Sequence, residues 1–255
     1  RLKPLAVLPL FAAAAMAALL SSCAGSSDRT LTKVFVAPPW TGDERHEYRL
    51  LDEGEDLYGS CVLETDVDAE PGKTRLSRLC ANEPRYRDDG TVLVDSRTLT
   101  PFEAARVRTD AEKNERVAAL SDYEPPVVNF TFDDRGKVRE TVRDLPEPTE
   151  ESPDPGYYDD ESLLWLIRGI DLREGYEGSF QNVNAGTGQT FPVDLKVEGQ
   201  ETVKVPAGEF TAWKIRIRTA SVTQFAWVEA EGSRRLVKAR MEGIEDVIYE
   251  LTGSN

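Results

Sequence analysis

The sequence predicts a mainly β protein with one or two short helices, because alternating strand-like runs dominate it and helical periodicity is rare. The alternation is clearest in FTAWKIRIRT, at 210–219, where Trp213, Ile215 and Ile217 share one face and mostly charged residues occupy the other. The run RRLVKARM, at 234–241, repeats this pattern from Val237 onward. A period of two residues is typical of a strand with one buried face, so both runs are expected to be strands.

Turn residues between the alternating runs predict hairpins. In ETVKVPAGEF, at 201–210, Pro206 presets φ for the first central turn position, and Gly208 permits a left-handed conformation. Three more hairpins are expected: a strand pair in HEYRLLDEGEDLYGSCVLETDV at 46–67, a turn around Asp89 and Gly90, and a turn from Asp133 to Gly136. Further strands are expected around 176–184 and 190–198.

The best helical signal is DDESLLWLIRGI, at 159–170. Leu163, Leu166 and Ile167 would share one face of this helix. Asp160 or Ser162 can cap its start, and the glycine that follows the apolar residues can end it.

The segment 144–160 predicts an exposed connector, since it contains four prolines and seven acidic residues. The acidic pairs at 88–89, 133–134 and 159–160 lie within three residues of a Gly, and turn formation explains them. Residues 40–255 are long enough for a single β domain that contains this connector. A flexible tether is expected before it, at 23–39.

The N-terminal residues follow the pattern of a lipoprotein signal peptide over 1–22. Arg1 and Lys3 precede an apolar run at 5–20, which is short for a transmembrane helix. The sequence Leu20-Ser21-Ser22-Cys23 resembles the bacterial lipobox, which implies that the thiol of Cys23 carries diacylglycerol after export. The domain would then be anchored by lipid to the cell membrane or outer membrane, outside the cytoplasm. The alternative is a plain secretory peptide with an incidental cysteine.

The charge balance excludes some classes of partner. The chain carries 31 basic and 46 acidic residues, and residues 1–22 hold two of the basic and none of the acidic ones, so the mature chain has a net charge of −17. Nucleic-acid binding needs clustered Lys and Arg, so no nucleic-acid partner is expected. A polybasic contact with anionic lipid is disfavoured for the same reason.

After Cys23 only two cysteines remain, Cys61 and Cys80. An even pair in an exported chain favours a disulfide between them. The alternative is two buried free thiols.

The sequence offers no catalytic residue, cofactor motif or metal site. His46 is the single histidine and is expected to be an ordinary surface residue near the start of a strand. No G-x-S-x-G nucleophile elbow is present, and the Cys and His residues that zinc prefers are missing. DPGYYDDE, at 154–161, is acidic but lacks the ligand spacing of a calcium loop.

Arg234, Arg235 and Lys238 form a short basic cluster in this acidic chain. The simpler interpretation is a solvated strand face whose charges pair with Glu229 or Glu242. A patch that binds a partner is the alternative.

The segment from about Gly175 to Leu251 resembles a bacterial family of exported proteins, the domain of unknown function 3108. The most specific match is E-x-V-x-V-P-A-G-x-F-x-A-x-K, at 201–214, and the earlier D-x-x-T-L-x-P, at 95–101, extends the resemblance to about 40–252. The resemblance implies a strongly curved antiparallel sheet or half-open β-barrel, like that of periplasmic lipoprotein carriers. It brings no established catalytic residues.

Three functions are compatible with these observations. The first is a non-catalytic lipoprotein that binds an apolar or lipid-like ligand on its curved sheet. The second is an envelope assembly or structural lipoprotein that contacts another protein through a sheet face or edge. The third is a hydrolase built on carboxylates, for which no sequence feature selects the residues.

Overall fold

A computed structural model describes residues 31–52, 55–148, 150, 156–220, 222–241 and 247–255 of the chain. The signal peptide, Cys23 and Glu242 lie outside these described residues. The described residues form one sheet of fifteen strands, in the order β8-β7-β6-β5-β4-β3-β2-β1-β15-β14-β13-β12-β11-β10-β9. This confirms the mainly β class. Among the described residues, no helix is long and apolar enough to span a membrane.

The strands are β1 (Glu44–Leu51), β2 (Leu57–Glu70), β3 (Lys73–Asn82), β4 (Tyr86–Asp95), β5 (Pro101–Asp110), β6 (Glu115–Glu124), β7 (Val127–Asp134), β8 (Lys137–Asp144), β9 (Tyr157–Asp159), β10 (Glu177–Asn184), β11 (Gln189–Val205), β12 (Gly208–Arg218), β13 (Thr223–Glu229), β14 (Leu236–Met241) and β15 (Val247–Ser254). Between β9 and β10 lie a 3₁₀ turn, η1 (Asp160–Ser162), and a short helix, α1 (Leu163–Leu166).

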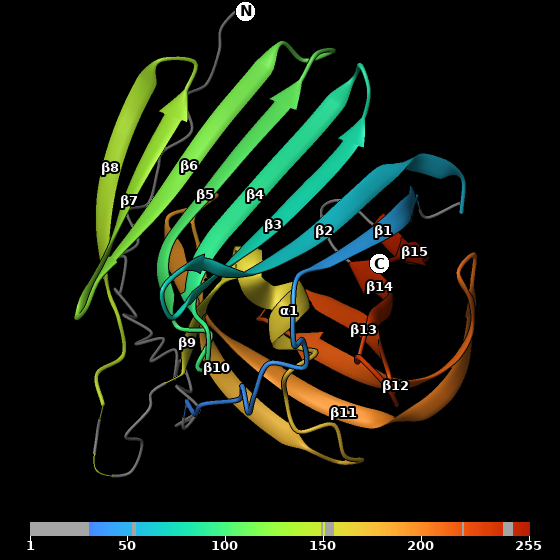
Figure 1. Cartoon of the computed structure of the whole chain (residues 1–255). Helices are drawn as coiled ribbons and strands as arrows, with labels where there is room; N and C mark the ends of the chain where they lie inside the picture. The colour runs from blue at the N-terminus through green and yellow to red at the C-terminus, as the bar shows by residue number, and fades with distance from the viewer. Residues whose placement is uncertain (1–30, 53–54, 149, 151–155, 221, 242–246) are drawn as a thin grey trace, which may run out of the picture.

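The sheet is strongly curved and open. Neighbouring strands are consecutive in the chain except where β1 pairs with β15, and they are antiparallel except where β9 pairs with β10. In Figure 1, β2 to β8 form a broad twisted layer, β10 to β15 curl beneath it, and α1 lies between the two. The sheet ends at β8 on one side and at β9 on the other, so the expected curved antiparallel sheet is confirmed.

Two segments of the chain fill the concave side of the sheet. Trp165, Leu166 and Ile167, in and just after α1, are fully buried in the main core. Residues 31–40 lie against this helical segment, and a Cβ atom on Gly169 would stand 2.1 Å from the ring of Phe35. The sheet lies on one side of this short helix and the N-terminal segment lies on the other. A helix that is buried in this way is expected to be apolar on all sides.

A second core closes the curve of the sheet. Phe130 and Phe132 of β7 pack with Val183 of β10, so strands far apart in the sheet order meet face to face. Tyr157 of β9 stacks on Tyr123 of β6 at a centroid distance of 6.2 Å. One face of β10 therefore contacts the main core, and the other contacts β6 and β7.

Two predicted turns form as their residues require. Arg135 and Gly136, between β7 and β8, both have positive φ values of 52° and 85°, as the common two-residue hairpin turn requires. The hairpin of β11 and β12 turns at 206–207, with Gly208 at φ 141°. In the D-x-x-T-L-x-P segment, Asp95 Oδ1 accepts the backbone N–H groups of Arg97 and Thr98.

The hairpin predicted around Asp89 and Gly90 is wrong. Both residues lie in the middle of β4, and the chain turns earlier, at 83–85. An Asp-Gly pair favours a turn locally, but at this position the glycine serves a contact with η1 that is described below.

The predicted connector is wrong at its C-terminal end. Residues 157–159 form β9, and Tyr158 and Asp159 are buried rather than exposed. Asp159 caps η1, since its Oδ1 accepts the N–H of Glu161 at 2.9 Å. Residues 149 and 151–155 lie outside the described part of the chain.

The alternation predicted for the late strands is confirmed in part. Ile215 and Ile217 of β12 are buried in the main core. In β14 a bulge opposite Trp227 and Val228 shifts the phase. Leu236 and Ala239 therefore face the main core, while Val237 joins a separate small cluster with Trp227.

Candidate functional site

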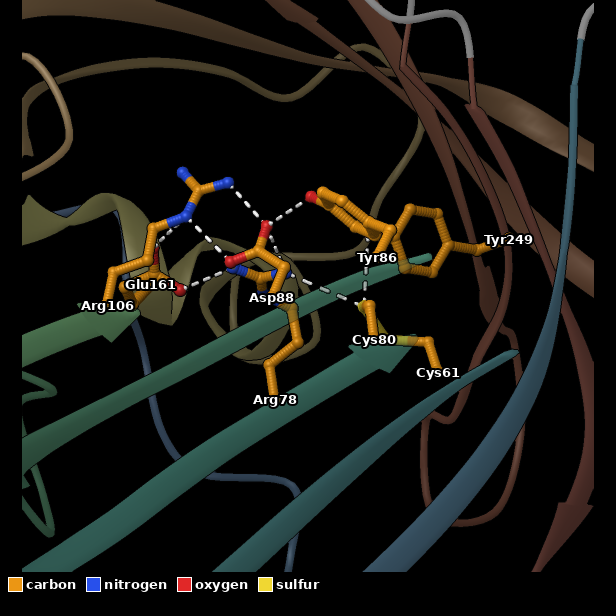
Figure 2. The surroundings of a disulfide bond; sticks show 8 residues. All are labelled: Cys61, Arg78, Cys80, Tyr86, Asp88, Arg106, Glu161 and Tyr249. Atoms are coloured by element: carbon orange, nitrogen blue, oxygen red, sulfur yellow. Dashed lines mark hydrogen bonds and ion pairs between the residues drawn. A yellow bond between two sulfur atoms is a disulfide. The ribbon is translucent and has the colours of Figure 1, made fainter. Parts of the chain in front are cut away.

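Four charged side chains gather on the concave side of the sheet, beside the disulfide (Figure 2). They are Arg78 of β3, Asp88 of β4, Arg106 of β5 and Glu161 of η1, which we call the Arg78–Glu161 network. The strand register explains the arrangement, because Gly90 of β4 is paired with both Arg78 and Arg106. Asp88 precedes Gly90 by two residues and so faces the same side.

The contacts within the network are close. Arg78 Nη2 donates to Glu161 Oε2 at 2.8 Å and lies 3.4 Å from Asp88 Oδ1. Arg106 donates through Nη2 and Nε to the two oxygens of Asp88, at 2.6 and 2.9 Å. This is the bidentate geometry that the guanidinium fork favours. The Tyr86 hydroxyl also donates to Asp88, at 3.0 Å.

The charges of the network balance each other. Burial would raise the pKa of Asp88, but the Arg78 charge and the hydrogen bonds and charge of Arg106 outweigh burial and lower that pKa. Burial would likewise lower the pKa of Arg78, but the charges of Glu161 and Asp88 raise it well above its usual value. Arg78 and Asp88 are thus both held charged in a largely buried position.

Gly90 provides the space for Glu161. A Cβ atom at position 90 would stand 2.0 Å from Glu161 Oε2 and 2.8 Å from its carboxyl carbon. No side chain fits in that space while Glu161 remains bound to Arg78. The glycine in the middle of β4 is therefore explained by close approach, not by a turn.

The two residues before Glu161 are also acidic, and Asp159 is buried while Asp160 is half-buried. The Tyr123 hydroxyl donates to Asp159 Oδ2, and burial raises the pKa of Asp159 to about 8. Asp160 accepts the side-chain amides of Asn182 and Asn184, at 3.0 and 3.1 Å. Burial and the charge of Glu161 raise the pKa of Asp160 as well. Three consecutive acidic residues thus bind three different parts of the sheet.

These contacts tie η1 and α1 to the sheet. Asp159 reaches β6, Asp160 reaches β10, and Glu161 reaches β3 and β5. The carboxylates accept hydrogen bonds from protein donors, so the arrangement resembles a structural ion cluster more than a nucleophile or general base. Removing one partner of such a buried pair typically costs about 3–5 kcal/mol.

The predicted disulfide lies next to the network. Cys61 of β2 and Cys80 of β3 are directly opposite in register and are bonded, with their Cα atoms 4.0 Å apart. Arg78 Nη1 lies 3.5 Å from Cys80 Sγ, and the buried Tyr249 hydroxyl lies 3.7 Å from the same atom. The disulfide and the ion network therefore belong to one buried region.

The prediction that His46 is an ordinary surface residue is wrong. Its side chain is buried, with a relative exposure of 3% for the residue, because β1 runs through the centre of the sheet. His46 Nε2 lies 3.3 Å from Glu44 Oε2, which also accepts Arg168 Nη2 at 2.8 Å. Arg168 donates further to the carbonyl oxygens of Ser233 and Arg234. This second polar group links β1 to the chain after α1.

The basic cluster near the C-terminus is largely paired with carboxylates. Arg235 forms the expected ion pair with Glu229, at 2.7 Å. Lys238 pairs with Glu250 at 2.9 Å, because β14 and β15 place them opposite each other. The predicted partner Glu242 lies outside the described residues.

Charged residues lie in the lining of two surface hollows of the described residues. One, of about 260 Å³, lies at the strand ends between 83–87 and 109–116, with Arg135 at its rim. Another, of about 200 Å³, lies over β2 to β4 and contains Arg45, Arg87 and Asp89. Within the described ranges, no group of three or more His, Cys, Asp or Glu residues is placed to hold a metal ion.

The longer free edge of the sheet is β8. Among the described residues its only neighbour in the sheet is β7, and seven of its eight residues are exposed. The side chains on its two faces differ. Lys137, Arg139 and Arg143 share the face of Phe130 and Phe132, and the opposite face carries valines and acidic residues.

Sequence reasoning missed the Arg78–Glu161 network entirely. A signal was present in the phase of the strands. Arg78 lies between the buried Leu76 and Cys80 on one face of β3, and Asp88 shares a face with Val92 of β4. A charged residue in phase with buried apolar residues indicates a buried charge that needs a partner.

Comparison with known proteins places the chain in a family. The model for the family described as "Protein of unknown function (DUF3108)" matches residues 84–245. A candidate exported protein with YmcC-like fold from Bacteroides fragilis is 14% identical, with a TM-score of 0.31 over 87% of this chain and 99% of that one. A candidate lipoprotein from Parabacteroides distasonis is also 14% identical, with a TM-score of 0.30 over the same shares. No curated protein matches the sequence. The family match covers more than half of the chain, from before β4 into the segment after β14, and the protein therefore belongs to the DUF3108 family.

Proposed function

We propose that the protein is an exported lipoprotein, held at a membrane by lipid on Cys23, and that it acts as a non-catalytic adaptor for another envelope protein. Export is supported by the lipobox residues 20–23 and by the Cys61–Cys80 disulfide, which is typical of an oxidising compartment. Leu31, the first described residue, follows Cys23 by eight positions. At about 3.5 Å per extended residue, this tether keeps the domain within about 28 Å of its anchor.

One observation carries the adaptor role: the concave side of the sheet is filled. A binding protein with a curved sheet normally keeps an apolar cavity for its ligand. Here Phe35, Trp40 and Trp165 occupy that space, and the Arg78–Glu161 network holds η1 in place. The surface that is left for contact consists of the outer face and the free edges of the sheet.

The apolar-ligand interpretation receives no support from the described residues. A lipid inside the sheet would have to displace α1 and break the buried ion pairs of Glu161. The two surface hollows described above include charged residues in their linings. Native mass spectrometry of the purified protein tests this interpretation. An added mass of lipid size that is lost on denaturation would favour a carrier and contradict the adaptor role.

The anchor is tested by substitution. In cells that export the full chain, Cys23→Ser should abolish labelling by a fatty acid and release the protein from the membrane fraction. Ser22→Ala is the matched control, since a small residue at this position still fits the lipobox. Equal membrane association of the Cys23→Ser variant would contradict lipid anchoring.

The adaptor role is tested by photo-crosslinking in the same cells. A photoreactive residue is placed at four exposed apolar positions, Val36, Leu57, Leu120 and Val138. We expect one discrete protein adduct from at least one position and none from the buried Leu166. Absence of an adduct at all four positions would argue against an adaptor.

A further inference from the structure

We propose that β8 binds an extended acidic segment of the partner protein, which adds a sixteenth strand to the sheet. This inference rests on the proposed adaptor function and specifies the surface and the chemistry of the contact. Strand addition supplies affinity through main-chain hydrogen bonds and specificity through alternate side chains.

Among the described residues, β7 is the one strand that pairs with β8, so the outer side of its backbone has no strand partner there, although the carbonyl oxygen of Val142 accepts Arg143 Nη1 at 2.8 Å. Strand β8 is eight residues long, whereas β9 at the opposite edge has three residues, of which Tyr158 and Asp159 are buried. The two-residue turn at 135–136 makes Asp134 and Lys137 the closing pair of the hairpin. In an antiparallel ladder every second residue bonds to its neighbour, so Val138, Glu140 and Val142 direct their N–H and C=O groups outward.

The inner face of β8 is basic. Lys137, Arg139 and Arg143 project from it, and among the described residues no carboxylate lies within ion-pair distance of any of the three. Arg139 lies over the ring of Phe132, 5.8 Å from its centroid. In a mature chain with a net charge of −17, three cations without carboxylate partners along one edge are a specific feature.

The outer face adds apolar contacts. Val138 and Val142 are 59% and 52% exposed, and Leu120 of β6 is 51% exposed on the same side of the sheet. A strand that adds to β8 would cover the two valines from the side. Its side chains would therefore alternate between acidic residues on the inner face and apolar residues on the outer face.

A second copy of β8 does not fit this edge. A two-fold axis perpendicular to the sheet pairs residues of the same face. In the register centred on Glu140, Lys137 would lie opposite Arg143, and in the register centred on Thr141, Arg139 would lie opposite Arg143. Like charges directly opposite each other destabilise a strand pair. The same charges also disfavour pairing of β8 with apolar strands of other proteins. Natural edge strands use charged side chains in this way to avoid aggregation.

The test uses the purified full chain in mild detergent and two fluorescent octapeptides, one of alternating Glu and Val and one of alternating Lys and Val. Binding is measured by fluorescence anisotropy. We expect the Glu–Val peptide to bind at least tenfold more tightly than the Lys–Val peptide. Equal affinity for the two peptides, or no binding of either, would overturn the inference.

Two variants test the edge directly. Glu140→Pro removes an outward N–H group without removing a bond to β7, since proline is tolerated at the solvent side of an edge strand. It should weaken binding of the Glu–Val peptide at least tenfold, and Glu140→Ala should not. Unchanged binding by a folded Glu140→Pro variant would also overturn the inference.

A charge exchange provides an independent check if the proline variant does not fold. Arg139→Glu combined with Arg143→Glu should reverse the preference between the two peptides, while preference for the Glu–Val peptide in this variant would contradict the inference.

The adaptor role is judged by a separate result. A crosslink at Val36 or Leu57 with no peptide binding would retain the adaptor and reject the β8 edge.

Discussion

Glu161 lies against Gly90, and the two residues fit together only because position 90 has no side chain. The contact joins η1 to the middle of β4, and it places the carboxylate within 2.8 Å of Arg78 Nη2. The absence of a Cβ atom at position 90 therefore permits the buried ion pair of Glu161 and Arg78. Changes at this contact and at the neighbouring Asp159 and disulfide test how much this region contributes to stability.

Gly90→Ala should destabilise the protein strongly. The added Cβ would displace the Glu161 carboxylate from Arg78, so the loss should approach that of a broken buried ion pair, about 3 kcal/mol in the free energy of unfolding. Urea unfolding at pH 7 measures it. Gly42→Ala is the control, because a Cβ at position 42 meets nothing within 4 Å. Equal stability of the two variants would show that Glu161 moves without cost.

Glu161→Gln should also be destabilising, because it removes the charge but nearly retains the shape. Arg78 would then share Asp88 with Arg106, and we expect a loss of about 3 kcal/mol. A double-mutant cycle with Arg78→Met should give a coupling energy above about 1 kcal/mol. The exposed pair of Arg87 and Asp89 is the control, and its cycle should give less than about 1 kcal/mol. Coupling of the same size in both pairs would argue against a special role for the network.

Asp159 should make stability depend on pH. Burial raises its pKa in the folded protein to about 8, whereas an unfolded Asp has a pKa of about 3.9. Its protonated form is thus favoured by folding. The contribution of Asp159 to the free energy of unfolding is fully present below about pH 4. It decreases as the pH rises and levels off above about pH 8.

Asp159→Asn tests this dependence, because the amide cannot ionise. Between pH 5 and pH 8 the wild-type protein should lose stability relative to the variant, on the order of 1 kcal/mol per pH unit. Urea unfolding at the two pH values gives the difference. The same pH dependence in both proteins would mean that Asp159 ionises freely in the folded state.

The disulfide should stabilise the sheet near the network. Its cysteines are 19 positions apart, and the chain-entropy model gives about 3 kcal/mol for a loop of this size. The double variant Cys61→Ser and Cys80→Ser should lose about that amount in the free energy of unfolding. Intact mass with and without reductant should differ by two hydrogen atoms in the wild type, because reduction adds two protons and two electrons to the disulfide. No change in mass on reduction would place free thiols at both positions.

The sequence was informative where the cause of a structure is local. The turn at Arg135 and Gly136 was predicted from Gly136, which accepts positive φ, and the pairing of Cys61 with Cys80 follows from two strands joined by one hairpin. The helical segment was likewise predicted from its apolar spacing, although α1 is only four residues long and Asp159, not Asp160 or Ser162, provides the side-chain cap. In each case the residues that decide the structure lie within about one hairpin of one another.

The buried network depends on contacts between distant residues, and there prediction failed. Arg78 and Glu161 are 83 positions apart, so no short window contains both. Gly90 was interpreted as a turn residue. The group that requires a glycine at this position is the carboxylate of Glu161, which comes from a distant segment of the chain. His46 was predicted to lie at the surface. It is buried because β1 lies between β2 and β15, and a single histidine in the sequence does not indicate that position in the sheet.

The pairing of β1 with β15 has a consequence for how the chain folds. All other neighbouring strands are consecutive in the chain, and all of these pairs except the parallel β9 and β10 are local hairpins that need little loop closure. The β1–β15 ladder instead joins His46 to Ser254, so it closes a loop of about two hundred residues and carries the largest loop-closure cost among the strand pairs of the described sheet. The same ladder brings Arg45 beside Asn255, and their backbone groups exchange hydrogen bonds.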